Sequence, residues 1–190
     1  MTSADKVQPM PPAHLVHVVL RTNKFKTMVQ YYKDFLGAHS SYENERLAFL
    51  QYDYEHHRIA IINLPDDAPV PAAGSVGMDH VAFSYESLDH LALTYRQRKA
   101  LGFLPTKCLN HGPTTSMYYT DPDGNRIEVQ VDNYKTAEEA SAFMAGPEFA
   151  RNPIGANFDP EEFCRRVESG EDHESIKKRV EVGARNIGDP

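Results

Sequence analysis

The sequence has few cysteines and no long apolar run, and each absence narrows the class of protein. Cys108 and Cys164 lie far apart in the 190-residue sequence, so they provide neither a disulfide framework nor the Cys-x-x-Cys spacing of a structural zinc site. No stretch approaches the roughly 18 consecutive apolar residues of a membrane span. The opening MTSADKVQPMPP lacks the apolar core of a secretory signal. We therefore expect no membrane contact and a reducing, cytoplasmic location.

Positive charge is also scarce. Twenty Lys and Arg residues stand against 27 Asp and Glu residues, which gives a formal net charge of −7, and no long basic block occurs. A protein that binds a phosphate backbone normally has the opposite balance, so nucleic acid is not an expected partner. The content of 41% hydrophobic and 25% charged residues is ordinary for a globular protein, so wholesale disorder is excluded.

From residue 13 to about residue 132, the sequence describes one structural unit twice. The first copy opens with HLVHVVL at 14–20, a β-branched run that predicts a strand. A helix follows, which Asn23 would cap and Gly37 would end. In the second copy MDHVAF at 78–83 predicts the strand, and its helix is predicted between Ser87 and Gly102. Further strands are predicted at 46–52, 57–64, 115–120 and 126–131, the last two joined by the turn sequence DPDGN.

These patterns predict an α+β fold built from two βαβββ modules, at 13–64 and 77–132. Because neither module could bury its sheet alone, we expect both to form a single catalytic domain, 13–132, around a cup-shaped half-barrel sheet. Residues 1–12, with three prolines, predict a flexible lead-in. Residues 133–190 predict a helical C-terminal extension, with caps at Thr136 and Asp159 and a charged helix running through Ile176 and Val180.

Strand alternation brings together three ionisable side chains. His17 lies on one face of the first strand, His80 takes the matching place in the second copy, and Glu128 shares a face with Arg126 on the last strand. One histidine on a strand is more often a hydrogen-bonded core residue, so the prediction rests on the repeated position. Two imidazoles and one carboxylate leave open positions on a metal, which suits ferrous iron in oxygen chemistry, and Mn²⁺ accepts the same set. We predict His17, His80 and Glu128 as metal ligands.

At this point the sequence resembles the vicinal oxygen chelate (glyoxalase-like) superfamily, which includes glyoxalase I, antibiotic-resistance binding proteins and type I extradiol catechol dioxygenases. HHRIA at 56–60 is similar to the dioxygenase segment in which the second histidine is the catalytic acid–base. SMY at 116–118 precedes Glu128 with the spacing of the family's active-site tyrosine, and DPDG at 121–124 resembles its turn. The resemblance covers about 13–132 and is greatest to the small, one-domain dioxygenases.

The resemblance implies an Fe²⁺-dependent extradiol dioxygenase that opens a catechol ring beside its two hydroxyl groups. Dioxygen would be the second substrate, and the product a muconic semialdehyde-type acid. His57 would move protons, Tyr118 would hold a substrate oxygen, and His111 occupies the region of another substrate-side histidine. A biaryl diol, an alkylcatechol and a DOPA-like acid all fit as substrates. Two-module proteins of this type often dimerise, so we expect a homodimer or a higher homo-oligomer.

Two other functions suit the same fold. A glyoxalase-like lyase or isomerase using zinc, nickel or cobalt usually needs a fourth protein ligand, often glutamate, on the matching strand of the first module. Here that strand reads HRIAII at 57–62, and its later positions are apolar, which favours an open three-ligand site. A metal-free binding protein of the antibiotic-resistance type would leave two ligand-type histidines and a glutamate without a role.

Overall fold

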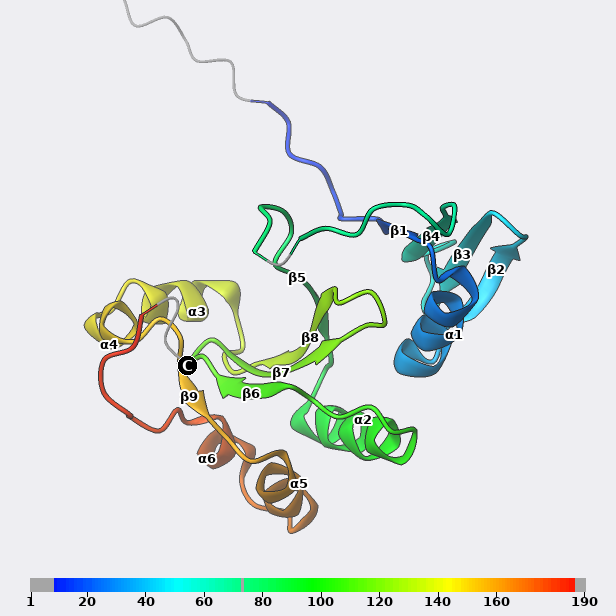
Figure 1. Ribbon diagram of the computed structural model, residues 1–190. Helices are drawn as coiled ribbons and strands as arrows, with labels where there is room; N and C mark the ends of the chain where they lie inside the picture. The colour runs from blue at the N-terminus through cyan, green and yellow to red at the C-terminus, as the bar shows by residue number, and fades with distance from the viewer. Residues whose placement is uncertain (1–8, 73, 187–190) are drawn as a thin grey trace, which may run out of the picture. The chain divides into compact units, whose positions relative to one another are not determined.

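The computed structural model (Figure 1) describes residues 9–72 and 74–186, and this part of the chain divides into two compact units. Unit 1 ends at Pro69 and unit 2 begins at Val70, inside the proline-rich stretch between the two predicted modules. Most of the predicted lead-in, residues 1–8, lies outside the described residues. Residues 9–17 contain no helix or strand.

Unit 1 is one βαβββ module. Its sheet has the order β1-β4-β3-β2, in which β1 is parallel to β4 and the other pairs are antiparallel. One face of the sheet packs on the helix, whose buried side chains recur at helical spacing and which ends at Gly37 with a φ of 65°. The elements are β1 (Val18–Thr22), α1 (Phe25–Leu36), β2 (His39–Glu43), β3 (Leu47–Gln51) and β4 (Ile59–Asn63).

Two predicted details of unit 1 are wrong. The first strand begins at Val18 rather than at residue 14, because its parallel partner β4 begins opposite it at Ile59. The Arg58 guanidinium instead bonds the carbonyl oxygens of Leu15 and Val16, at 3.0 Å each. Residue 23 does not cap α1 either. The cap position is Lys24, and the Asn23 amide donates to the carbonyl oxygens of residues 66 and 68.

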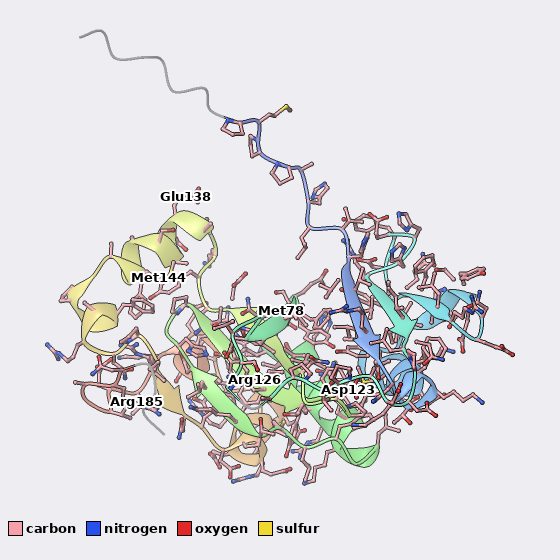
Figure 2. All side chains as sticks on the ribbon, turned by 45° about the horizontal axis from the view of Figure 1, so that its top comes forward. Met78, Asp123, Arg126, Glu138, Met144 and Arg185 are labelled. Carbon is pink, nitrogen blue, oxygen red and sulfur yellow. The ribbon has the colours of Figure 1, made fainter. Side chains whose placement is uncertain are left out.

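Unit 2 repeats the same topology and adds a strand at the edge. Its sheet has the order β5-β8-β7-β6-β9, and β5 is parallel to β8 as β1 is to β4. The turn between β7 and β8 forms as predicted: the Asp121 carboxylate accepts hydrogen bonds from the backbone N–H groups of Asp123 and Asn125. Figure 2 labels Asp123 in this turn. The module consists of β5 (His80–Ser84), α2 (Leu88–Ala100), β6 (Lys107–Asn110), β7 (Thr114–Thr120) and β8 (Arg126–Asp132).

The C-terminal extension packs within unit 2. It contains α3 (Ala137–Met144), α4 (Pro147–Arg151), β9 (Ala156–Asn157), α5 (Pro160–Glu168) and α6 (His173–Lys177). Thr136 and Asp159 cap their helices as predicted. The charged helix predicted through Ile176 and Val180 is present as α6, which contains Ile176, but its extension to Val180 is wrong, because the backbone is already extended at Lys178. Gly170, with a φ of 77°, separates α5 from α6. Residues 187–190 of the predicted extension lie outside the described residues.

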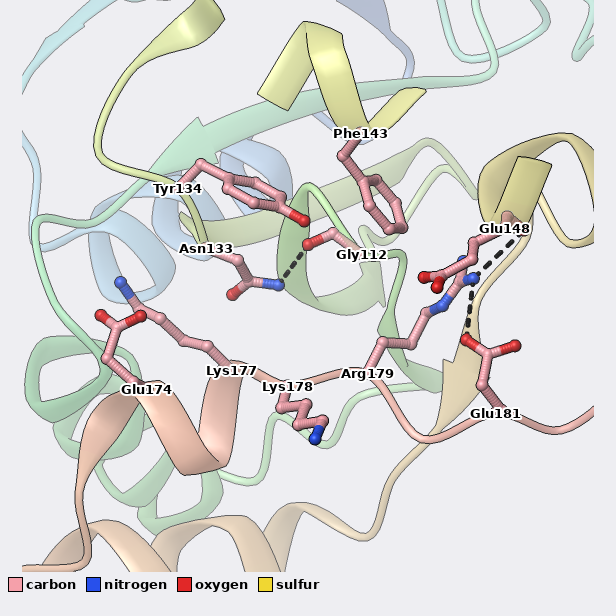
Figure 3. Close-up of a pocket in the computed structure, with 10 residues that line it drawn as sticks. All are labelled: Gly112, Asn133, Tyr134, Phe143, Glu148, Glu174, Lys177, Lys178, Arg179 and Glu181. Atoms are coloured by element: carbon pink, nitrogen blue, oxygen red, sulfur yellow. Dashed lines mark hydrogen bonds and ion pairs between the residues drawn. The ribbon is translucent and has the colours of Figure 1, made fainter. Parts of the chain in front are cut away.

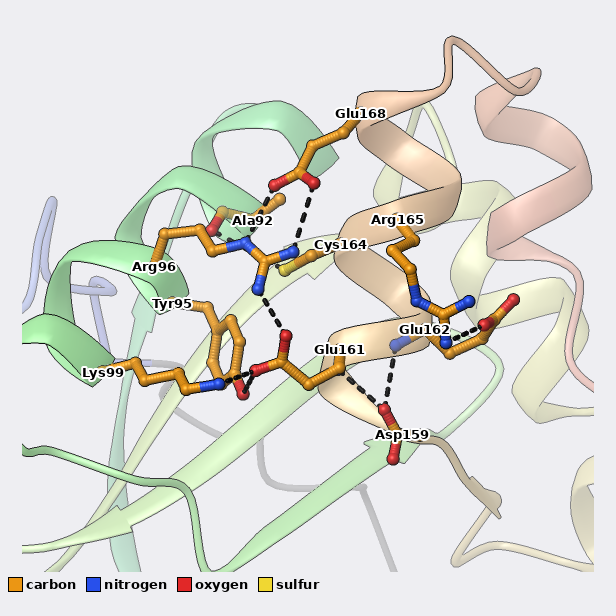
Figure 4. Close-up of polar contacts among 10 residues, drawn as sticks. All are labelled: Ala92, Tyr95, Arg96, Lys99, Asp159, Glu161, Glu162, Cys164, Arg165 and Glu168. Atoms are coloured by element: carbon orange, nitrogen blue, oxygen red, sulfur yellow. Dashed lines mark hydrogen bonds and ion pairs between the residues drawn. The ribbon is translucent and has the colours of Figure 1, made fainter.

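Helices α2 and α5 cover one face of the unit 2 sheet. Ile127, Val129 and Val131 on β8 turn to this face and are buried. Helix α5 is held on α2 by Glu161, whose carboxylate contacts the Arg96 side chain (Figure 4). The face that carries Glu128 is the opposite one. Helices α2 and α5 therefore do not cover the face that carries Glu128.

The α+β class and the two βαβββ modules are confirmed, and both sheets are open. The single catalytic domain and its cup-shaped half-barrel stay predictions. Among the described residues, none of the helices is long and apolar enough to cross a membrane.

Candidate functional site

Four predicted site residues meet on one face of the unit 2 sheet. Nε2 of His80 lies 2.9 Å from Oε2 of Glu128. Nε2 of His111 lies 2.8 Å from the Tyr118 hydroxyl, and the same hydroxyl hydrogen-bonds Glu128. The side chains therefore form one chain of contacts in the order His80, Glu128, Tyr118, His111.

Strand register explains why these residues meet. Tyr118 on β7 is the direct antiparallel partner of Glu128 on β8, so both side chains point to the same face. Ala82 on β5 is the parallel partner of Glu128, and its small side chain leaves room for the His80 ring to reach the carboxylate. His111 begins the short loop between β6 and β7.

Burial controls the protonation of this cluster. The Glu128 side chain is only 6% exposed. Burial raises the pKa of Tyr118, and the neighbouring Glu128 carboxylate raises it further. Burial lowers the pKa of His111, against the opposing influence of Glu128 and of a backbone hydrogen bond with Ile154. At neutral pH the phenol is therefore protonated and the imidazole is predominantly neutral.

Asp79 is a further member of the cluster, and the sequence pattern did not predict it. Its Oδ2 lies 2.7 Å from Nδ1 of His80 and 3.1 Å from the Arg126 guanidinium. The hydrogen bond with His80 lowers the pKa of Asp79. A carboxylate on one ring nitrogen fixes a histidine with its other nitrogen directed at a metal, which here is Nε2 beside Glu128. The position of Asp79 immediately before the predicted ligand His80 is the sequence feature that could have indicated it.

Unit 1 brings together the two other predicted residues. The rings of His17 and His57 have centroids 4.5 Å apart, and the His57 ring stacks on Phe49 at 4.3 Å. Nδ1 of His57 lies 2.6 Å from Nδ1 of His56, so one ring donates and the other accepts. Burial lowers the pKa of His57, and the imidazoles of His17 and His56 lower it further.

The sheet face around these rings is apolar. His17 precedes β1 on the face away from α1, and register places Val19, Phe49, Ala60 and Ile62 on that same face. Val19 is 47% exposed, so part of this surface is open to a ligand. Positions 60 and 62 of β4 offer no atom that could bind a metal.

The predicted metal ligands are divided between the units. Within neither unit do the described residues include three His, Cys, Asp or Glu side chains grouped to hold a metal. Unit 2 supplies the converging pair His80 and Glu128, and unit 1 contains His17. A three-ligand set that draws on both units stays a prediction.

Comparison with known proteins identifies the family. The model described as "Glyoxalase/Bleomycin resistance protein/Dioxygenase superfamily" matches residues 14–129. Biphenyl-2,3-diol 1,2-dioxygenase 2 of Rhodococcus globerulus is 44% identical over 144 residues, which is 76% of each chain. Biphenyl-2,3-diol 1,2-dioxygenase 3 of the same organism is 40% identical over 167 residues, covering 87% of this chain and 88% of that protein.

A solved structure agrees on the fold. Lactoylglutathione lyase from Agrobacterium tumefaciens superposes with a TM-score of 0.51 over 64% of this chain and 96% of its own, at 19% identity. The family match spans nearly all of both βαβββ modules, and the two relatives at 44% and 40% identity extend over most of the chain. The chain therefore belongs to the Glyoxalase/Bleomycin resistance protein/Dioxygenase superfamily, and within it to the extradiol dioxygenases.

Proposed function

We propose that this enzyme is an Fe²⁺-dependent dioxygenase that opens a catechol ring beside its two hydroxyl groups and forms a muconic semialdehyde-type product. The observation that carries the proposal is the contact chain His80–Glu128–Tyr118–His111. It combines a histidine–carboxylate donor pair with a phenol and a neutral imidazole. Two dioxygenases that are 44% and 40% identical to this chain support the same reaction class.

His17, His80 and Glu128 would hold the ion, and the residues of unit 2 suit that role. Nε2 of His80 and the buried Glu128 carboxylate converge, and Asp79 holds the other side of the His80 ring. A ferrous ion in such a set, with Mn²⁺ as an acceptable substitute, would act as a Lewis acid on both catechol oxygens and offer a position to dioxygen.

The other site residues would bind the substrate and move its protons. With Nδ1 of His57 donating to His56, its Nε2 would be the nitrogen that accepts a hydroxyl proton. Stacking on Phe49 fixes the plane of the His57 ring. Tyr118 would donate a hydrogen bond to a substrate oxygen, with His111 beside it.

A biaryl diol is the substrate that we propose. The unit 1 face formed by Val19, Phe49 and Ile62 offers apolar contacts for a second ring, and both relatives are named for biphenyl-2,3-diol. Biphenyl-2,3-diol should therefore have a higher kcat/KM than an alkylcatechol or a DOPA-like acid. The lyase alternative is disfavoured, because Ala60 and Ile62 occupy the strand positions where a fourth ligand would be needed.

The cellular setting and the assembly are further parts of the proposal. Cys108 and Cys164 are buried free thiols, and burial raises the pKa of Cys108 to about 12 and that of Cys164 to about 11. Unpaired thiols suit the reducing cytoplasm. A homodimer or a higher homo-oligomer is the assembly that we propose, and sedimentation of the full chain tests it.

Anaerobic loading with ferrous ion, followed by a catechol and then air, tests the function. We expect oxygen uptake together with a new visible absorbance from the ring-opened product. Glu128→Gln should abolish both signals, whereas Gln97→Glu on the exposed side of α2 should change neither. Absence of oxygen uptake and of absorbance with biphenyl-2,3-diol and several other catechols would contradict the proposal.

A further inference from the structure

The C-terminal extension reaches the loop that carries His111 through one buried arginine. The Arg179 side chain is only 4% exposed. Its guanidinium donates hydrogen bonds to the carbonyl oxygens of His111, at 3.2 Å, and Asn152, at 2.8 Å. It also lies over the Phe143 ring, 5.2 Å from the centroid. Figure 3 shows Arg179 beside Phe143 and Glu148.

Burying this guanidinium is costly. Its Nε has no hydrogen-bond partner among the described residues, and a buried polar group without a partner destabilises a fold. The contacts with the two carbonyl groups and with Phe143 offset that cost. Of these contacts, the bond to the His111 carbonyl oxygen joins the extension to the loop between β6 and β7, whereas Asn152 and Phe143 belong to the extension itself.

The same extension also holds the ring of His111. The imidazole hydrogen-bonds the backbone of Ile154, and because this bond favours the protonated form, the ring donates it to the carbonyl oxygen. On its other side, Nε2 of His111 lies 2.8 Å from the Tyr118 hydroxyl, which also hydrogen-bonds Glu128. The contacts with Ile154 and Tyr118 therefore hold the orientation of the His111 ring.

Two buried asparagines, Asn133 and Asn110, hydrogen-bond the loop between β6 and β7 and the C-terminal extension. The Asn133 amide donates to the carbonyl oxygen of Gly112, at 2.8 Å, and to the Asn110 side chain. The Asn110 amide in turn donates to the carbonyl oxygen of Lys177, at 2.8 Å. At Gly155, a Cβ would lie 2.1 Å from the Asn110 carbonyl oxygen, so this close approach requires glycine.

We propose that the C-terminal extension is part of the catalytic apparatus, and that Arg179 is a positioning residue that holds His111 in the orientation facing Tyr118. The inference rests on the proposed function, in which His111 and Tyr118 face the substrate. The structural part of the inference does not depend on that function: removing Arg179 frees the His111 loop and ring. The extension would thereby act at the site without touching the substrate.

Arg179→Met and Arg179→Lys test the proposal, with Arg96→Met as the matched control. Met removes the guanidinium and keeps an apolar side chain over Phe143, whereas Lys keeps the charge with fewer donors. Arg96 pairs with Glu161 and Glu168 on the α2–α5 side of the sheet, so its loss removes comparable ion pairs away from His111. If Arg179→Met does not fold, Arg179→Lys provides the same readouts.

The first readout is the imidazole ¹⁵N spectrum of the full chain loaded with diamagnetic zinc, with His111 assigned from His111→Gln. We expect two well-separated His111 nitrogens in the wild type and in Arg96→Met. In Arg179→Met they should move toward the averaged values of a free imidazole, and Arg179→Lys should be intermediate. Unchanged His111 signals in a folded Arg179 variant would overturn the proposal.

The second readout is a double-mutant cycle in kcat with the ferrous enzyme. Arg179→Met should lower kcat about 10- to 100-fold, as misplacement of a catalytic group does. In the His111→Gln background it should cost no more than about twofold, because both changes then act through one residue. An equal loss in both backgrounds would overturn the positioning role. If the wild type cleaves no catechol, the proposed function fails, while the ¹⁵N spectrum still decides the role of Arg179.

Discussion

At the scale of single side chains, His57 is the group best placed to exchange a proton. Its ring is stacked on Phe49, and burial lowers its pKa below the ordinary value of 6.5, so it is neutral and able to accept a proton at neutral pH. We expect His57→Gln to lower kcat by about 10²- to 10⁴-fold, the usual contribution of general acid–base catalysis. Steady-state oxygen uptake measures the effect.

The adjacent His56 provides the matched control for that prediction. Its side chain is 69% exposed, and it contacts His57 through Nδ1 and through a tilted ring pair. We expect His56→Gln to change kcat by no more than about tenfold, because it alters the partner of the base and not the base itself. Equal losses in the two variants would show that the histidine pair matters only for the fold.

The adjacent residues Tyr118 and Tyr119 allow a proposed substrate contact to be compared with a contact in the hydrophobic core. Tyr118→Phe should lower kcat/KM about 10- to 100-fold, because a hydrogen bond to a charged oxygen contributes about 1.5–3 kcal/mol. Tyr119 lies on the opposite, helix-covered face and is 1% exposed. Tyr119→Phe should therefore change thermal stability and leave kcat/KM within about twofold. The reverse pattern would remove Tyr118 from the site.

At the scale of elements, hydrophobic pattern and turn residues predicted most of the fold. Ser87 caps α2 by accepting a hydrogen bond from the His90 N–H group, and Gly37 ends α1, as expected. Strands β2 and β6 were not located, because neither has a long β-branched run: β2 reads HSSYE, and β6 reads KCLN. Their positions depend on pairing with β3 and β7, which no local pattern contains.

The stability that the contact between α2 and α5 provides should depend on pH. Hydrogen bonds from Lys99, Tyr95 and Arg96 lower the pKa of Glu161 from 4.5 to about 2. A carboxyl with a depressed folded-state pKa stabilises the fold above its unfolded pKa and loses that contribution as pH falls. The wild type should therefore lose stability between about pH 4.5 and pH 2, and Glu161→Gln should flatten this part of the profile. Thermal unfolding across that window measures it.

Glu162→Gln is the control for that experiment, because Glu162 pairs only with Arg165 on its own helix among the contacts described. Glu161 is exposed, so the effect should be modest and should diminish with added salt. Identical pH profiles for the two variants would contradict the role of Glu161 in holding α5 on α2 (Figure 4).

At the scale of the whole molecule, repetition in the sequence predicted the paired modules and placed His17 and His80 at matching positions. Alternation along β8 correctly put Glu128 on the face away from the helices, where His80 contacts it. The contribution of the extension could not be foreseen, because Arg179 acts on the carbonyl of a residue 68 positions away. A contact between residues so far apart in the sequence produces no pattern in the spacing of neighbouring residues.

His17, His80 and Glu128 are proposed to hold one metal ion, and anaerobic titration with ferrous ion decides whether they do. The wild type and His14→Ala, a change at an exposed neighbouring histidine, should bind one ion per chain with equal affinity. His17→Ala, His80→Ala and Glu128→Gln should each weaken binding by more than the roughly 10- to 100-fold typical of losing an outer-shell partner. Unaltered affinity in any of these three folded variants would contradict the ligand set.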